Sequence, residues 1–100
     1  MLYPGLSTHP LHAVAAKQMH GGFGGMMSLR VRAGEEAAKL FTGKLRVFKR
    51  ATSLGSVESL AEHRASVEGP GTQCPTDLVR LSIGIEHVDD LIEDIEEALS

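Results

Sequence analysis

The segment Leu78–Glu86 places the strongest constraint on the fold, because its apolar and small or polar residues alternate along its length. Such alternation is typical of a β-strand with one face against a hydrophobic core. The apolar face would consist of Val79, Leu81, Ile83 and Ile85. The opposite face carries Arg80, whose guanidinium would be a rigid planar fork suited to a carboxylate. The alternative is an arginine on the solvated face of an antiparallel sheet, without a binding role.

The remaining pattern predicts helices and strands in alternation. Apolar residues at helical spacing predict helices over 11–19, over 34–43 with Gly43 as a stop, and from Val88 to the C-terminus. Alternation predicts strands at 27–32 and 45–48, and a possible strand at 57–61. The acidic residues of the last helix are expected on its solvated face: Glu93, Asp94, Glu96 and Glu97.

This order of elements predicts an α+β fold, an α/β two-layer sandwich with a small mixed or antiparallel sheet of three or four strands and helices on one face. The other face of the sheet is expected to carry Arg30, Arg46 and Arg80. A chain of 100 residues suffices for one domain, here residues 1–100. Residues 1–20 would form a helical lead-in, and residues 21–100 would form the sandwich.

Composition excludes several classes of partner. The formal net charge is −3, aromatic residues make up 4%, and Trp is absent, all of which argue against a nucleic-acid-binding surface. No apolar run has the length of a membrane helix. The single cysteine, Cys74, cannot form an internal disulfide, and a cytoplasmic location is expected.

Two local patterns invite ligand hypotheses that the surrounding sequence does not support. The run Gly21–Gly25 could bind a phosphate through backbone N–H groups, but a strand pattern follows it, so a sharp bend or a close backbone approach is the preferred interpretation. His9 and His12 could share a helix face as metal ligands. Because no third ligand follows at a fixed spacing, capping or surface roles are preferred, and no metal site is predicted.

Five motifs lie in order along nearly the whole chain. They are Leu2–Pro10 with His12; Gln18-Met19 leading into Phe23-Gly24-Gly25-Met26; Ser53-Leu54-Gly55 with Glu58-Ser59-Leu60; Val79–Glu86; and Asp89-Asp90-Leu91-Ile92 with Asp94. Together they resemble the C-terminal domain of the Cys/Met-metabolism pyridoxal-phosphate enzymes, the relatives of cystathionine gamma-synthase, gamma-lyase and beta-lyase.

The resemblance implies fold type I, in which a large domain carries pyridoxal phosphate and a small C-terminal domain closes over an amino-acid substrate. It implies that Arg80 binds the substrate α-carboxylate and that Ser53 helps to hold it, with Thr52 as a further substrate-binding position. Thr52 stands where gamma-synthases and gamma-lyases often have glutamate, and Ser56 stands where a second glycine is common. The lyase and gamma-replacement branches therefore both stay open.

The family's cofactor lysine lies in a Ser-x-Thr-Lys context, and none of the four lysines here does: Lys17, Lys39, Lys44 and Lys49. No catalytic or cofactor-binding residue is therefore predicted in this chain. The leading hypothesis is the substrate-carboxylate-binding C-terminal part of a transsulfuration enzyme, inactive alone, that works with its large cofactor domain and forms a homo-oligomer. The alternatives are a non-catalytic truncated or interaction module that keeps the fold, and a free-standing amino-acid-binding domain.

Overall fold

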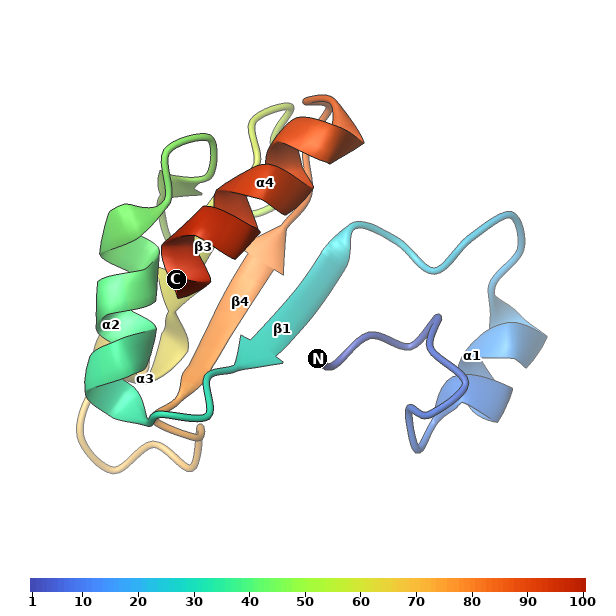
Figure 1. Ribbon diagram of the computed structural model, residues 1–100. Helices are drawn as coiled ribbons and strands as arrows, with labels where there is room; N and C mark the ends of the chain where they lie inside the picture. Colours follow the sequence, from blue (N-terminus) through green and yellow to red (C-terminus); the bar gives the residue numbers. More distant parts are fainter.

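A computed structural model, which describes residues 1–100, places two helices across one face of a four-stranded mixed sheet (Figure 1). The elements in chain order are α1 (His12–Gln18), β1 (Met26–Arg30), α2 (Glu35–Lys44), β2 (Lys49–Arg50), β3 (Leu60–His63), α3 (Arg64–Glu68), β4 (Leu78–Ser82) and α4 (Val88–Leu99). The strand order is β1-β4-β3-β2. Strand β4 is antiparallel to β1 and β3, whereas β2 is parallel to β3. The predicted α+β class is confirmed.

Strand β4 lies inside the sheet and supplies the centre of the core. Val79 and Leu81 are completely buried in a core cluster that includes residues of α2 and α4. These two helices cover this face of the sheet (Figure 1). Burying an aliphatic side chain of this size contributes roughly 1.5–3 kcal/mol. The predicted apolar face extends past the end of β4 only as far as Ile83, which is partly buried against the core, whereas Ile85 is 81% exposed. Beyond Ser82 the regular strand pairing ends, although the N–H groups of Ile83 and Ile85 still donate to the carbonyls of Gly25 and Val57.

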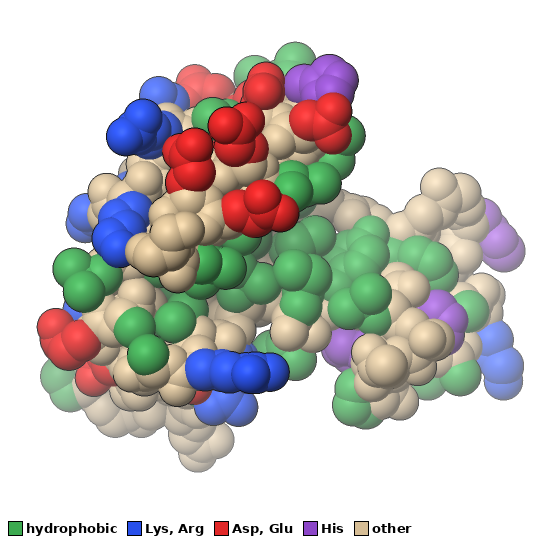
Figure 2. Space-filling view, in the orientation of Figure 1, with side chains coloured by type: hydrophobic (Ala, Val, Ile, Leu, Met, Phe, Trp, Pro, Cys, Tyr) green, Lys and Arg blue, Asp and Glu red, His purple; other side chains and the backbone are tan.

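Asp94 corrects the prediction that the acidic residues of α4 all face solvent, because it is 4% exposed. Its carboxylate accepts three backbone N–H bonds, from Arg46 at 2.8 Å, Val47 at 2.9 Å and Phe48 at 3.0 Å. The other acidic side chains of α4 do lie on the surface, where they gather over the helix (Figure 2).

The same contact explains why the strand predicted at 45–48 is wrong. The backbone donors of this segment bond to Asp94 rather than to a neighbouring strand, and the strand pairing starts only at Lys49. Arg46 is consequently not on the sheet face with Arg30 and Arg80. Two further differences concern helices: α2 continues through Gly43 to Lys44, and the short helix α3 was not predicted.

The lead-in lies away from the sandwich and is tied to it at β1 (Figure 1). Leu2 pairs with Ser28 through two backbone hydrogen bonds, of 2.7 and 3.0 Å. His12 contacts the carbonyl of Pro4 through Nδ1 at 2.7 Å, and its ring stacks at a tilt on Phe23. The histidine that the sequence singled out together with His9 therefore has a local structural role. None of the helices has the length and apolar character needed to cross a membrane.

The glycine run before β1 acts as the sequence predicted. Gly21, Gly22 and Gly24 have φ values of 80°, 148° and 84°, a region that side-chain-bearing residues rarely adopt. At Gly25 an added Cβ would lie 3.2 Å from the carbonyl oxygen of Ile83. The run thus both bends the chain and allows a close backbone approach.

We expect Asp94→Ala to lower the free energy of unfolding by about 2–4 kcal/mol, because it leaves three backbone N–H groups without their acceptor. Urea denaturation followed by circular dichroism measures the change. Glu93→Ala, at an exposed position next to it on α4, is the control and should change the stability by less than about 0.5 kcal/mol. Equal effects of the two substitutions would contradict this role of Asp94.

Candidate functional site

Arg80 stands on the face of the sheet opposite the helices, where β4 places it in a row with its neighbours. The register puts Ser28 of β1 on one side of it and Glu62 of β3 on the other. Because Val79 and Leu81 are fully buried on the helix side, alternation directs the Arg80 side chain to the other face. The side chain is 20% exposed, so it lies at the surface but is largely enclosed.

One end of the Arg80 guanidinium is fixed by the protein. Its Nη2 donates to the carbonyl oxygens of Thr52, at 3.0 Å, and Ser53, at 3.3 Å, and forms an ion pair with Glu62 Oε1 at 3.3 Å. The nitrogens Nε and Nη1 make no hydrogen bond within the chain. The guanidinium therefore keeps N–H donors for an external acceptor while its orientation is held.

The Thr52–Gly55 bend is fastened to the same strand at a second point. The Gly55 N–H donates to Ser82 Oγ at 2.9 Å, and Ser82 lies two residues after Arg80 on the same side of β4. Gly55 has φ 75°, which favours glycine at this corner. Two side chains of β4 thus position a bend that comes from a distant part of the chain.

The structure brings together all three residues that the resemblance assigned to the substrate, Arg80, Ser53 and Thr52. Arg80 contacts the main-chain carbonyls of Thr52 and Ser53, which leaves the Ser53 hydroxyl out of this contact. The Ser53 side chain is exposed and its hydroxyl makes no hydrogen bond within the chain. A second donor is consequently available next to the guanidinium.

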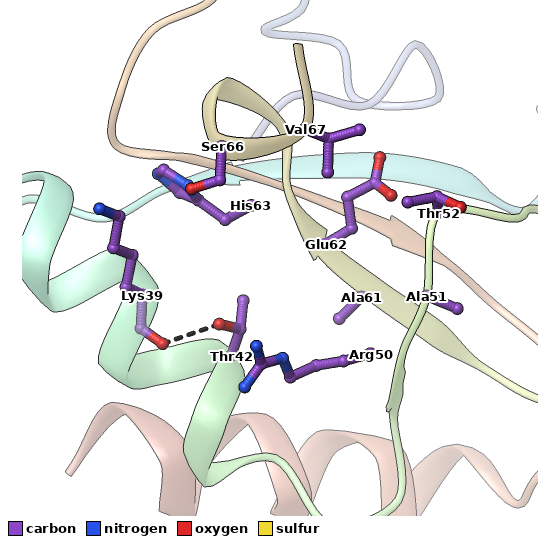
Figure 3. A pocket seen from close by; sticks show the side chains of 10 residues that line it. All are labelled: Lys39, Thr42, Arg50, Ala51, Thr52, Ala61, Glu62, His63, Ser66 and Val67. Atoms are coloured by element: carbon purple, nitrogen blue, oxygen red, sulfur yellow. Dashed lines mark hydrogen bonds between the residues drawn. The ribbon is translucent and has the colours of Figure 1, made fainter. Parts of the chain in front are cut away.

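A cavity of about 430 Å³ lies next to this bend, between α2, the sheet edge and α3 (Figure 3). Its lining residues are Lys39, Thr42, Arg50, Ala51, Thr52, Ala61, Glu62, His63, Ser66 and Val67. The Glu62 carboxylate points toward Thr52 in Figure 3, whereas Thr42 donates to the Lys39 carbonyl on the far side. Arg80 does not line the cavity, so the cavity and the arginine are neighbouring features joined by Thr52 and Glu62.

Glu62 is the residue of this site that sequence reasoning missed. The possible strand at 57–61 stopped one residue short of it, whereas β3 continues to His63. Its side chain is 4% exposed and touches two cations, Arg80 and Arg64. Extending the predicted strand by one residue would have included Glu62, an acidic residue on the face that carries Arg80.

Arg64 continues this set of charges into α3. Besides Glu62, it contacts Glu68, with Nε at 3.2 Å from Glu68 Oε2. A hydrogen bond from the Thr72 hydroxyl and the contact with Arg64 both lower the pKa of Glu68. Glu68 is therefore a stable anion, and the charges alternate in sign from β4 through β3 to α3.

Glu86 locks the other end of β3 to the segment that follows β4. Its carboxylate accepts from the Ser59 backbone N–H at 2.8 Å and from the Ser59 hydroxyl at 2.6 Å, and the same hydroxyl accepts from the Gly84 N–H at 2.8 Å. The Ser59 hydroxyl and N–H lower the pKa of Glu86 below its usual range. This contact keeps β3 and β4 aligned, and with them Glu62 and Arg80.

Comparisons with known proteins decide the family. The model of the Cys/Met metabolism PLP-dependent enzymes matches residues 1–100. The chain belongs to this family. Cystathionine gamma-synthase of Mycobacterium tuberculosis is 55% identical over 99% of the chain, and cystathionine gamma-lyase of Saccharomyces cerevisiae is 45% identical over 97%. The resemblance inferred from the motifs is confirmed.

Solved structures of the family agree with the fold. The crystal structure of metB from Corynebacterium glutamicum superposes on 97% of the chain with a TM-score of 0.90 and 54% identity. Cystathionine gamma-synthase from Xanthomonas oryzae in complex with cystathionine gives a TM-score of 0.87 and 45% identity. The chain covers 26% of the mycobacterial enzyme and 27% of the Xanthomonas chain, so it spans about a quarter of the relatives it matches.

We expect Glu86→Gln to lose its destabilising effect as the pH falls. The folded state depresses the pKa of Glu86. The ionised carboxylate therefore adds its full share to the free energy of unfolding above the unfolded-state pKa of about 4.3, and that share is lost as the pH drops through the folded-state pKa. The difference in free energy of unfolding between parent and variant should shrink from about pH 7 to about pH 3. Urea unfolding at several pH values measures it.

Glu58→Gln is the control for this titration, because Glu58 is exposed and its carboxylate makes no hydrogen bond. Its difference from the parent should stay small across the same pH range. A difference for Glu86→Gln that stays constant down to about pH 3 would exclude an ionised Glu86 as the stabilising species.

Proposed function

We propose that this chain is the substrate-carboxylate-binding C-terminal part of a pyridoxal-phosphate-dependent transsulfuration enzyme, inactive alone. The reaction would be carbon–sulfur lysis or gamma-replacement on cysteine- or homoserine-type amino acids. Family membership and the quarter-length coverage of the relatives support the proposal. The observation that carries it is the state of Arg80, fixed through Nη2 and open at Nε and Nη1.

The chain's own contribution would be to orient the substrate. The open donors of Arg80 can take the two oxygens of an α-carboxylate, and the Ser53 hydroxyl can donate to the same group. A carboxylate held at two or three points fixes the direction of the bonds at Cα, and such fixation lowers the entropic part of a reaction barrier. Thr52 would contribute through its carbonyl, which holds Arg80 in place.

The residues of this chain do not fit the cofactor itself. Lys39 lies within 3.5 Å of Glu35, and Lys44 donates to the Ser100 carbonyl, so both have other partners. No lysine belongs to the row formed by Ser28, Arg80 and Glu62. Pyridoxal phosphate would be held by the part of the full-length enzyme that this chain does not cover.

The relatives favour one substrate branch. The mycobacterial relative is named a cystathionine gamma-synthase and the yeast relative a cystathionine gamma-lyase, so an amino acid with a leaving group at Cγ is the favoured substrate class. Thr52 lacks the carboxylate that often precedes the serine in such enzymes, and it has only a hydroxyl in that place. Which sulfur amino acid or homoserine ester is accepted depends on the pocket walls outside this chain.

Exposed apolar side chains support a large partner domain. Helix α1 buries none of its residues, and Leu11 before it and Val14 within it are at least half exposed. Apolar side chains also continue between the sandwich and the lead-in on the face seen in Figure 2. We assign this surface to contact with the large cofactor domain, within a cytoplasmic homo-oligomer of the full-length protein. A non-catalytic module that retained the fold would use the same surface for another partner.

The test uses a holoenzyme in which these 100 residues replace the matching C-terminal quarter of the Mycobacterium tuberculosis relative. Arg80→Gln should weaken binding of 2-aminoisobutyrate by about 100-fold, because a charge-assisted double contact with the carboxylate is lost. Binding of isopropylamine, the same molecule without the carboxylate, should not change. Calorimetry measures both affinities, and the visible absorbance of bound cofactor shows that each variant is loaded.

Arg30→Gln is the matched control. Arg30 stands on the same face of the sheet, on the neighbouring strand β1, but is paired with Asp77 at 2.8 Å and 54% exposed. Its removal should leave both affinities unchanged. If Arg80→Gln leaves the 2-aminoisobutyrate affinity at the parental value, Arg80 is not the carboxylate site.

A further inference from the structure

We propose that Glu62 is a positioning residue for Arg80, and that Arg64 neutralises Glu62 so that Arg80 retains an uncompensated positive charge for the substrate carboxylate. The inference rests on the proposed role of Arg80. It adds two residues, one on β3 and one on α3, that touch neither substrate nor cofactor. They act through Arg80 alone.

The register of the sheet fixes the first contact. Glu62 and Arg80 are directly paired across β3 and β4, so their side chains leave the same face side by side. Oε1 of Glu62 lies 3.3 Å from Nη2 of Arg80, the nitrogen that the carbonyls of the bend also hold. Every contact that orients the guanidinium thus falls on one of its nitrogens, and the other two stay open.

A buried carboxylate beside Arg80 raises an electrostatic problem. At 4% exposure Glu62 is poorly screened by water, so its charge would oppose an anion that approaches Arg80. Taken alone, the two side chains form a neutral pair, which attracts a carboxylate less than a single cation does. Glu62 can therefore hold Arg80 without cancelling its attraction for an anion only if a second cation neutralises Glu62.

Arg64 supplies that cation from the first position of α3. Its Nη1 contacts Oε1 of Glu62, the same oxygen that faces Arg80. Arg80, Glu62 and Arg64 together carry one net positive charge. Arg64 is itself held by Glu68, whose side chain is 37% exposed and therefore better screened by solvent than Glu62.

The second oxygen of Glu62 shows that this group is not placed for its own hydrogen bonding. Oε2 is buried and has no hydrogen-bond partner. A buried polar atom without a partner costs free energy, and an apolar side chain of similar size would avoid that cost. Both contacts of the carboxylate go to arginines through Oε1, which is the arrangement expected of a group that spaces and orients two cations.

The decisive experiment is a double-mutant cycle in the holoenzyme used above, with 2-aminoisobutyrate and isopropylamine as probes. Arg64→Gln should weaken 2-aminoisobutyrate binding by about tenfold, because it uncovers the charge of Glu62 a few ångströms from the bound carboxylate. In a protein that already carries Glu62→Gln, adding Arg64→Gln should change the affinity for 2-aminoisobutyrate by less than about twofold, since no negative charge is left to neutralise. Isopropylamine binding should not respond in any variant.

Arg64→Lys is the rescue control, because it keeps the positive charge with a different geometry. It should restore the 2-aminoisobutyrate affinity to within about twofold of the parent. A purely structural role of Arg64 would instead change both probes alike, or would change affinity equally with and without Glu62. Either result, or an unchanged affinity in Arg64→Gln, overturns the proposal.

Positioning is tested separately in the 100-residue chain by NMR of the Arg80 Nη2–H protons, on the nitrogen that Glu62 and the bend hold. Glu62→Gln should speed the exchange of these protons with water by about tenfold as Nη2 loses its ionic contact. Glu58→Gln, at an exposed glutamate in the preceding loop, should leave it unchanged. An unaltered rate in Glu62→Gln contradicts the positioning role. Loss of affinity in Arg80→Gln but not in Arg64→Gln refutes this inference and leaves the proposed function standing.

Discussion

The pairing of β4 with strands on both of its sides is the constraint on which the rest of the structure depends. It forces Val79 and Leu81 to one side and Arg80 and Ser82 to the other, so a single strand supplies both the centre of the core and the anchors of the candidate site. The apolar side cannot be exposed without losing the core, and the polar side is therefore presented with little freedom. Hydrophobic burial on the opposite face thus determines which way Arg80 points, and the contacts of Nη2 with the bend and with Glu62 hold its guanidinium.

Three acidic side chains connect segments that β-pairing alone does not join. Asp94 ties the segment before β2 to α4, Glu86 ties the start of β3 to the segment after β4, and Glu62 ties β4 to α3 through two arginines. In each case a carboxylate accepts several donors at once, which a charged acceptor does better than a neutral one. Apart from Asp94, the buried residues that α4 contributes to the core are apolar, as are those that α2 contributes to it.

Much of this architecture could be predicted from the sequence, because the pattern of apolar residues is a local property. The alternation around Arg80, the helical spacing after Val88 and the glycine run before β1 all predicted the observed elements. The errors occurred where a distant partner decides the outcome. The segment 45–48 alternates as a strand does, but its donors are taken by Asp94, which lies more than 40 residues away.

In the candidate site, too, local sequence patterns predicted part of the arrangement and distant partners determined the rest. Motifs could bring Arg80, Ser53 and Thr52 into one hypothesis, whereas the choice between hydroxyl and carbonyl as the contact depends on backbone direction at the bend. Glu62 was missed because its significance comes from strand register, and register depends on which strands are neighbours. The apolar position Ile85 was wrongly placed in the core for a related reason: the alternation continues past the last residue of β4 that is covered.

Gly84 closes the connection that Glu86 makes, and its geometry has a consequence for variation in this protein. A Cβ at this position would lie 2.7 Å from the Ser59 nitrogen and even closer to the Val57 carbonyl oxygen, both of them main-chain atoms that cannot swing aside. Any side chain would therefore push the crossing backbones apart, and with them the alignment of Ser59 and Glu86. Many exposed positions of this domain can accept substitutions, but at this crossing the space beside the Cα holds only the hydrogen atom of glycine.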